Sequence, residues 1–155
     1  MPFKDILDLI NSLVVVLGVP IAIWQYIKTK QKERSDREYG TYDALDEKFI
    51  AFQQLCLEHP DLDIFDIPDK SPAKLNAVQE KEELIIFTIL FSIFERAYLL
   101  YIYNDQSSEL KERQWSGWDE YIQAFSKRQN FKNAWKVSGA TFDKKFEEYM
   151  KKIII

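Results

Sequence analysis

Apolar side chains follow one another almost without a break from Leu9 to Ile27, and a basic segment comes directly after them. About 19 helical residues at roughly 1.5 Å each reach about 28 Å, which is enough to cross the hydrocarbon core of a bilayer. Membrane helices tolerate an internal proline better than soluble helices do. The pattern predicts an N-terminal transmembrane helix whose membrane-anchor residues are Leu13, Val16, Gly18, Pro20, Trp24 and Tyr26.

The charges on the two sides of this segment are unequal. The preceding side has one lysine, whereas the following side carries Lys28, Lys30, Lys32 and Arg34. Because basic residues gather on the cytoplasmic side, we expect a single-pass protein of the cytoplasmic (inner) membrane with its N-terminus outside and its C-terminal domain in the cytoplasm. The four basic residues are expected to contact lipid headgroups. The small residues Gly18 and Ala22 would also allow a homo-oligomer.

Two other interpretations compete with the anchor. A cleaved signal peptide needs a basic start and a small-residue cleavage site. Here Lys4 is offset by Asp5 and Asp8, and no such site follows. A buried soluble helix that is apolar on every side needs a larger protein around it than 155 residues supply. The anchor is therefore preferred.

The remaining chain has helical periodicity. Between residues 31 and 57, one apolar stripe steps by three or four positions, with Gly40 as the expected bend. Its members are Tyr39, Tyr42, Leu45, Phe49, Phe52 and Leu55. Ser71-Pro72 predicts the start of a second helix over 73–104. With 4 glycines and 5 prolines there are too few turn residues for a chain of hairpins. We predict an all-α protein with an anchor at 1–30 and a cytoplasmic bundle of about four helices at 31–155.

The last third of the chain predicts shorter helices. One covers 107–126, and the apolar positions of another include Phe131 and Trp135, with Asn130 as its N-cap. Thr141 is the expected N-cap of the final helix, whose apolar stripe is Phe142, Phe146, Tyr149 and Met150.

Residues 84–103 form the second strongly apolar segment, and they allow two interpretations. They are either the central helix of the bundle or a second membrane span. Glu95 and Arg96 lie past the middle of such a span, where each would cost about 2.5–3.5 kcal/mol on insertion. We therefore prefer a buried helix with Leu90 and Phe94 in the core.

Overall charge and cysteine content narrow the function classes. The net charge of −4 argues against nucleic acid as the main partner. Cys56 is the single cysteine, so an intrachain disulfide is impossible, which agrees with a cytoplasmic domain. Placed between two leucines, Cys56 is interpreted as a small core residue.

The loop over 59–69 holds the densest group of potential metal ligands, namely His59, Asp61, Asp63 and Asp66. Carboxylate oxygens at this density suit a divalent cation. The glycine and glutamate of an EF-hand are missing, and aspartates also favour turns by bonding their own backbone. A structural loop is preferred over a metal site or an enzyme. The common catalytic signatures are absent, so no catalytic residue and no cofactor is assigned.

Two groups of apolar side chains are candidates for partner binding. Trp115 and Trp118 have helical spacing, which core packing also explains. The chain ends with Ile153, Ile154 and Ile155 behind two lysines, and such a tail is expected to contact the bundle, a lipid surface or a partner.

Several short motifs occur in a recognisable order, namely His59-Pro60-Asp61-Leu62, Phe94-Glu95-Arg96, Trp115-x-x-Trp118, Phe131-x-x-x-Trp135 and Phe142-x-x-x-Phe146. In this order, behind an anchor and a basic exit, the chain resembles uncharacterised small bacterial membrane proteins with one N-terminal anchor helix and a helical cytoplasmic domain. The resemblance implies no known reaction.

These observations favour a non-enzymatic, membrane-anchored interaction or scaffold module. Its expected partners are membrane lipid and a protein of unknown identity. One alternative is a two-span membrane effector or pore-forming toxin with residues 84–103 as the second span. The other is an enzyme or metal site that uses the 59–69 loop.

Overall fold

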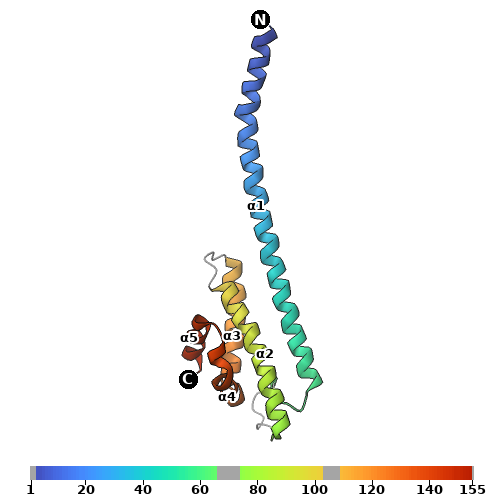
Figure 1. Ribbon diagram of the computed structural model, residues 1–155, viewed down its shortest axis with the longest axis vertical. Helices are drawn as coiled ribbons and strands as arrows, with labels where there is room; N and C mark the ends of the chain where they lie inside the picture. The colour runs from blue at the N-terminus through green and yellow to red at the C-terminus, as the bar shows by residue number, and fades with distance from the viewer. Residues whose placement is uncertain (1–2, 66–73, 103–108, 155) are drawn as a thin grey trace. The chain divides into compact units, whose positions relative to one another are not determined.

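The structure is a computed structural model that describes residues 3–65, 74–102 and 109–154, without the side chains of residues 3–19, 34–35, 37–39 and 110. These residues form helices α1 (Phe3–Glu58), α2 (Ala77–Tyr101), α3 (Glu109–Ser126), α4 (Gln129–Ser138) and α5 (Lys144–Ile153), with a 3₁₀ turn, η1 (Gly139–Thr141), between the last two (Figure 1). No strand occurs in these ranges, so the predicted all-α class is confirmed for them.

The chain divides into two compact units, Met1–Ala44 and Leu45–Ile155. Helix α1 supplies the first unit and continues into the second. It passes without interruption through Pro20 and through Gly40, where a bend was predicted. The division of the chain into an anchor at 1–30 and a cytoplasmic domain at 31–155 stays a prediction.

The N-terminus of α2 is set by a capping box. The Asn76 side chain accepts hydrogen bonds from the backbone N–H groups of Val78 and Gln79, and the Gln79 side chain accepts one from the Asn76 backbone. These contacts satisfy N–H groups that the first helical turn leaves without partners. The predicted start at Ser71-Pro72 is therefore wrong, and α2 begins at Ala77.

The two predicted caps in the last third are also wrong. Helix α4 begins at Gln129, so Asn130 lies inside its first turn and Arg128 occupies the cap position. Asp143 caps α5 by accepting from the N–H groups of Lys145 and Phe146. The Thr141 hydroxyl instead donates to the Ser138 carbonyl at 2.7 Å, which closes the η1 turn.

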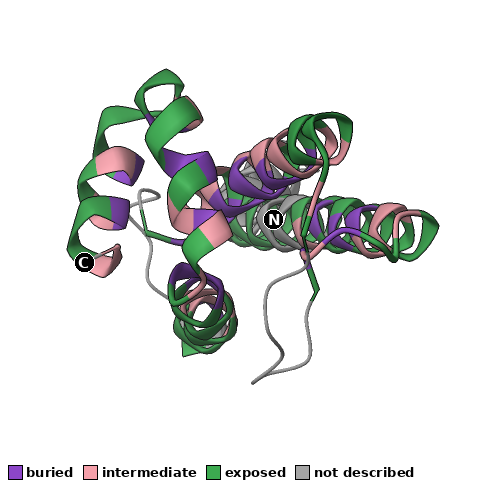
Figure 2. Cartoon of the chain, turned by 90° about the horizontal axis from the view of Figure 1, so that it is seen from below, coloured by how far each residue is buried: buried purple, intermediate pink, exposed green. Residues whose placement is uncertain are grey.

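Helix α2 is central to the second unit. It contacts α3, α4 and α5, and its inward face is buried (Figure 2). Leu90 and Phe94 are both 0% exposed, which confirms that they are core residues. The end of α1 contributes Leu45, Phe49 and Phe52, three buried members of the predicted stripe.

By length and composition alone, α2 could also cross a membrane, and within the part of the chain that the structure describes it is the one helix found to do so. It lies in the middle of the chain, and 44% of its most apolar window is buried inside the protein. The core helix of a soluble domain has the same length and composition.

Aromatic rings fill most of this core. Phe91 contacts Phe131 and Trp135 edge-on, with ring centroids 4.8 and 5.1 Å apart. Trp135 in turn stacks on Phe142 at 5.6 Å. Edge-to-face and offset-stacked pairs are the geometries that aromatic quadrupoles favour. The α4–η1–α5 segment is therefore fixed against α2 through its rings.

Gly139 makes this packing possible. A Cβ atom built there would lie 2.6 Å from Cε2 of Trp135, which is closer than carbon atoms approach without a shift. Trp135 has little room to move because Phe91, Phe142 and Phe146 surround it.

We expect Gly139→Ala to destabilise the second unit by about 1–3 kcal/mol, because the extra methyl group overpacks the core. Urea or thermal unfolding of a fragment starting at Ser35 measures this. Gly117→Ala is the matched control, since nothing lies within 4 Å of its Cβ position and alanine favours helix. Equal stability of the two variants would contradict the tight Gly139–Trp135 contact.

Candidate functional site

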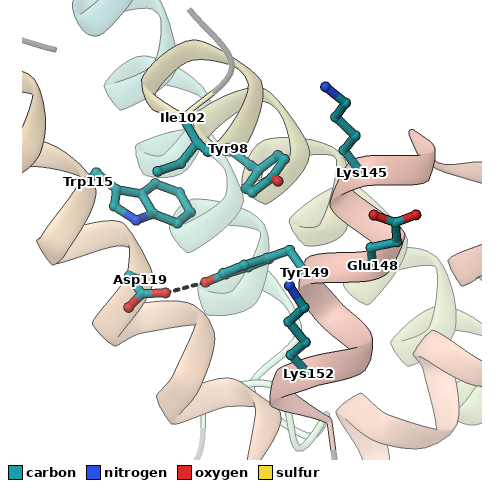
Figure 3. A pocket seen from close by; sticks show the side chains of 8 residues that line it. All are labelled: Tyr98, Ile102, Trp115, Asp119, Lys145, Glu148, Tyr149 and Lys152. Carbon is teal, nitrogen blue, oxygen red and sulfur yellow. Dashed lines mark hydrogen bonds between the residues drawn. The ribbon is translucent and has the colours of Figure 1, made fainter.

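A cleft of about 340 Å³ lies in the second unit where the C-terminal end of α2 meets α3 and α5 (Figure 3). This volume is in the range of small-molecule sites in proteins. The residues that line it are Tyr98, Ile102, Trp115, Asp119, Lys145, Glu148, Tyr149 and Lys152. The cleft combines aromatic, acidic and basic groups.

Three aromatic rings, one from each helix, form the base of the cleft. The ring centroid of Tyr98 lies 5.8 Å from that of Trp115 and 5.0 Å from that of Tyr149, and Trp115 and Tyr149 are 5.5 Å apart. These distances leave no room for a ligand between the rings. A ligand can therefore use only the ring surfaces that face the cleft.

A hydrogen bond connects the two sides of the cleft below these rings. The Tyr149 hydroxyl on α5 donates to Oδ1 of Asp119 on α3 (Figure 3). The Gln123 side chain donates to Oδ2 of Asp119 at 2.8 Å. Burial, followed by the neighbouring Asp119 carboxylate, raises the pKa of Tyr149 far above its ordinary value. Tyr149 therefore stays protonated and keeps donating at physiological pH.

The rim of the cleft has charges of both signs along α5. Lys145, Glu148 and Lys152 are three and four residues apart and therefore share one side of the helix. Burial is the first cause of a raised pKa at Tyr98, and the charges of Asp143 and Glu148 add to it. Negative charge from Glu148 therefore reaches the aromatic base.

The neighbouring basic residues of α5 are engaged elsewhere. Lys144 and Lys151 both make ion pairs with Glu147, at 3.0 and 2.8 Å. Hydrogen bonds from these lysines lower the pKa of Glu147. On one side of α5, Lys144 and Lys151 thus pair with Glu147, whereas another side of the helix lines the cleft.

Helix α5 is positioned by its buried face and its N-terminus. Phe146 and Met150 are fully buried, which turns the cleft-lining residues toward α2 and α3. Oε1 of Glu95 on α2 accepts a hydrogen bond of 2.6 Å from the Asp143 backbone N–H. Glu95 therefore has a structural role.

The acidic loop makes structural hydrogen bonds. Arg128 donates to the backbone carbonyls of Asp63 and Ile64, and its Nη2 also lies 3.0 Å from Oδ1 of Asp63. Asn130 donates to the Asp63 carbonyl at 2.6 Å and to Oε2 of Glu83 at 3.2 Å. Burial raises the pKa of Glu83. These contacts attach the loop to α4 and α2.

The described candidate metal ligands of this loop make other contacts. The Asp61 carboxylate accepts from Gln79 at 2.5 Å, which lowers its pKa, and the His59 carbonyl accepts from the Leu62 N–H. Asp66 lies outside the described residues. In the described ranges, no three His, Cys, Asp or Glu side chains are grouped in a way that could hold a metal ion.

The predicted partner-binding residues lie in different surroundings. Trp115 lines the cleft, whereas Trp118 packs edge-on against Phe49 at 5.2 Å and Phe94 at 6.2 Å. Ile153 ends α5 and Ile154 caps it, and both are half-buried, while Ile155 is outside the description. Of the predicted partner-binding residues that the structure describes, Trp115 is the one that lines the cleft.

The structure describes the side chains of some of the predicted anchor and headgroup-contact residues. Leu13, Val16, Gly18 and Arg34 have side chains outside the description, whereas Pro20, Trp24, Tyr26, Lys28, Lys30 and Lys32 are all exposed. Nζ of Lys28 lies 4.3 Å from the Trp24 ring centroid, and Nζ of Lys30 lies 5.9 Å from that of Tyr26. These are cation–π distances.

Sequence reasoning missed the other cleft residues because they lie on three separate helices. Tyr149 was recognised only as part of an apolar stripe, and Asp119, Lys145 and Lys152 resemble ordinary surface charges. No local motif marks them. In comparisons with known proteins, no family model, curated protein or solved structure matches this chain.

We expect Arg128→Gln to lower the stability of the second unit by about 1.5–3 kcal/mol, since it removes hydrogen bonds from a charged donor to partly buried acceptors. The side chains of Arg128 and Asp63 are 21% and 14% exposed. Urea unfolding of the fragment starting at Ser35 provides the measurement. Arg96→Gln, at an exposed position of α2, is the control and should stay within about 0.5 kcal/mol. An Arg128 variant as stable as this control would refute the structural role of the loop contacts.

Proposed function

We propose that this protein is a non-enzymatic, membrane-anchored interaction module of the bacterial inner membrane. In this proposal, residues 9–27 form the anchor, and the Leu45–Ile155 unit faces the cytoplasm and binds its partner there. One observation carries the proposal. An apolar helical segment is exposed on every described side, in a chain that also has a separate, well-packed unit.

The described part of the anchor supports membrane insertion. Ile21, Ile23 and Trp24 are 54%, 54% and 57% exposed, and neighbouring exposed apolar side chains of this size are typical of a surface that contacts lipid or a partner. Trp24 and Tyr26 come immediately before the basic residues, in the order expected at a membrane–water interface. Their rings lie within cation–π distance of Lys28 and Lys30, so in an inserted helix aromatic rings and cations would share one depth.

The second unit supports a binding role better than a catalytic one. The candidate ligands Asp61 and Asp63 are engaged in hydrogen bonds that hold the loop. Burial raises the pKa of the Cys56 thiol to about 11, so it remains protonated and weakly nucleophilic near pH 7. These features favour an interaction module over the enzyme alternative.

A two-span effector or pore-forming toxin remains the second candidate, and the apolar character of α2 is the observation in its favour. Insertion of α2 would require its aromatic contacts with α3, α4 and α5 to separate. It would also carry Glu95 and Arg96 into the membrane. Both costs favour the single-span proposal.

We expect full-length protein carrying Val16→Asp and Ile21→Asp to leave the membrane fraction. Each charge near the centre of the span costs about 2.5–3.5 kcal/mol. Carbonate extraction followed by sedimentation and immunodetection measures the distribution. Val137→Asp is the control, because Val137 is apolar and 70% exposed but lies on α4. If the double variant sediments like this control, residues 9–27 do not anchor the protein.

Topology separates the single-span from the two-span proposal. We expect reporter fusions placed after Lys32 and after Ile155 both to report the cytoplasm, because α2 stays inside the folded unit. Paired alkaline phosphatase and fluorescent-protein reporters provide opposite signals on the two sides of the membrane. Reporters on opposite sides would favour α2 as a second span.

A further inference from the structure

We propose that the cleft between α2, α3 and α5 binds a zwitterion composed of an ammonium group and a phosphodiester, the chemistry of an ethanolamine or choline phospholipid headgroup. This goes beyond the proposed interaction module, because it assigns a small-molecule ligand to the cytoplasmic unit. The inference depends on the lining of the cleft and not on the anchor.

The order of charges along α5 selects the ligand class. Lys145, Glu148 and Lys152 alternate positive, negative and positive on the side of the helix that lines the cleft. A purely anionic ligand would place its charge against Glu148. A purely cationic ligand would meet both lysines. A zwitterion has a partner for each sign, so it fits this rim better than either ion.

The aromatic base provides the ammonium subsite. Trp115 and Tyr98 expose ring surface to the cleft, and aromatic faces attract ammonium and quaternary ammonium groups (Figure 3). Glu148 lines the same cleft, so a cation held over these rings has a carboxylate nearby. Asp119 cannot take the same role as readily, since its two oxygens already accept from Tyr149 and Gln123.

Lys152 provides the phosphate subsite. It lies one helical turn beyond Glu148, so a phosphate at Lys152 and an ammonium group at Glu148 are neighbours, as they are in the ligand. Lys144 and Lys151, the other basic residues of α5, do not line the cleft and are paired with Glu147. A volume of about 340 Å³ accommodates a headgroup with its glycerol.

The test is calorimetric titration of the full-length protein in maltoside micelles, which contain neither ammonium nor phosphate. The probes are glycerophosphoethanolamine and glycerophosphocholine. Glycerol phosphate, which lacks the ammonium group, and ethanolamine, which lacks the phosphate, are the single-charge controls. We expect saturable binding of at least one zwitterion and weaker binding of both controls. No saturable binding, or equal binding of glycerol phosphate, would overturn the proposal.

Three variants test the two subsites. Lys152→Gln should weaken zwitterion binding roughly three- to tenfold by removing a partner of the phosphate. Lys151→Gln, one residue away and paired with Glu147, should leave it unchanged. Glu148→Gln should weaken zwitterion binding but strengthen glycerol phosphate binding, a reversal that a loss of folding cannot produce. Equal effects of the two lysine variants, or parallel losses for both ligands in Glu148→Gln, would overturn the assignment.

A second arm distinguishes a membrane headgroup from a free metabolite. The full-length protein is placed in nanodiscs of phosphatidylglycerol alone or mixed with phosphatidylethanolamine, and the soluble zwitterion is titrated again. Weaker apparent affinity in the mixed discs would identify the lipid headgroup as a competitor for the cleft. Equal affinity would assign the cleft to the free zwitterion. Loss of the membrane anchor affects neither the micelle titration nor its variants.

Discussion

Burial of the aromatic face of α2 is the interaction on which the second unit depends. Phe87, Phe91 and Phe94 have no exposed surface, and every later helix contributes a ring to this face. Phe131 from α4 contacts all three of them, with centroids 4.8–6.5 Å apart. Without these partners, the most apolar helix of the described chain would have no protein surface to cover it. The apolar composition of α2 would suit a membrane span, but in this unit aromatic rings from the other helices cover its apolar face.

The remaining architecture follows from that constraint. Because Trp135 packs against Phe91, the chain after α4 must turn sharply, and Gly139 allows the close approach that this turn requires. The η1 turn then directs α5 back across α2, where Phe146 and Met150 complete the core. At the other end of the unit, Arg128 attaches the loop after α1 to the start of α4. Helix α5 lines the cleft with residues outside its buried face, namely Lys145, Glu148, Tyr149 and Lys152.

In our proposal, function divides between the two units. The first has apolar side chains that nothing in the described chain covers, followed by aromatic and basic residues in contact. The second has a dense core and a mixed cleft, in which a protonated tyrosine connects two helices through Asp119. We infer that anchoring and ligand recognition are separable properties. A membrane location would raise the local concentration of any headgroup that the cleft recognises, so the two properties would also reinforce each other.

The sequence by itself determined the all-α class and much of the core. Periodicity identified Phe49 and Phe52 on α1 and Leu90 and Phe94 on α2, because an amphipathic stripe is a local property. It placed helix starts wrongly where several polar residues compete to cap, as at Asn76. Only the tertiary structure decided the rest. Asp63 and Arg128 pair across 65 residues, and the cleft joins three helices whose residues look unremarkable in their own segments. Such long-range contacts depend on how the helices pack around α2, which no local pattern encodes.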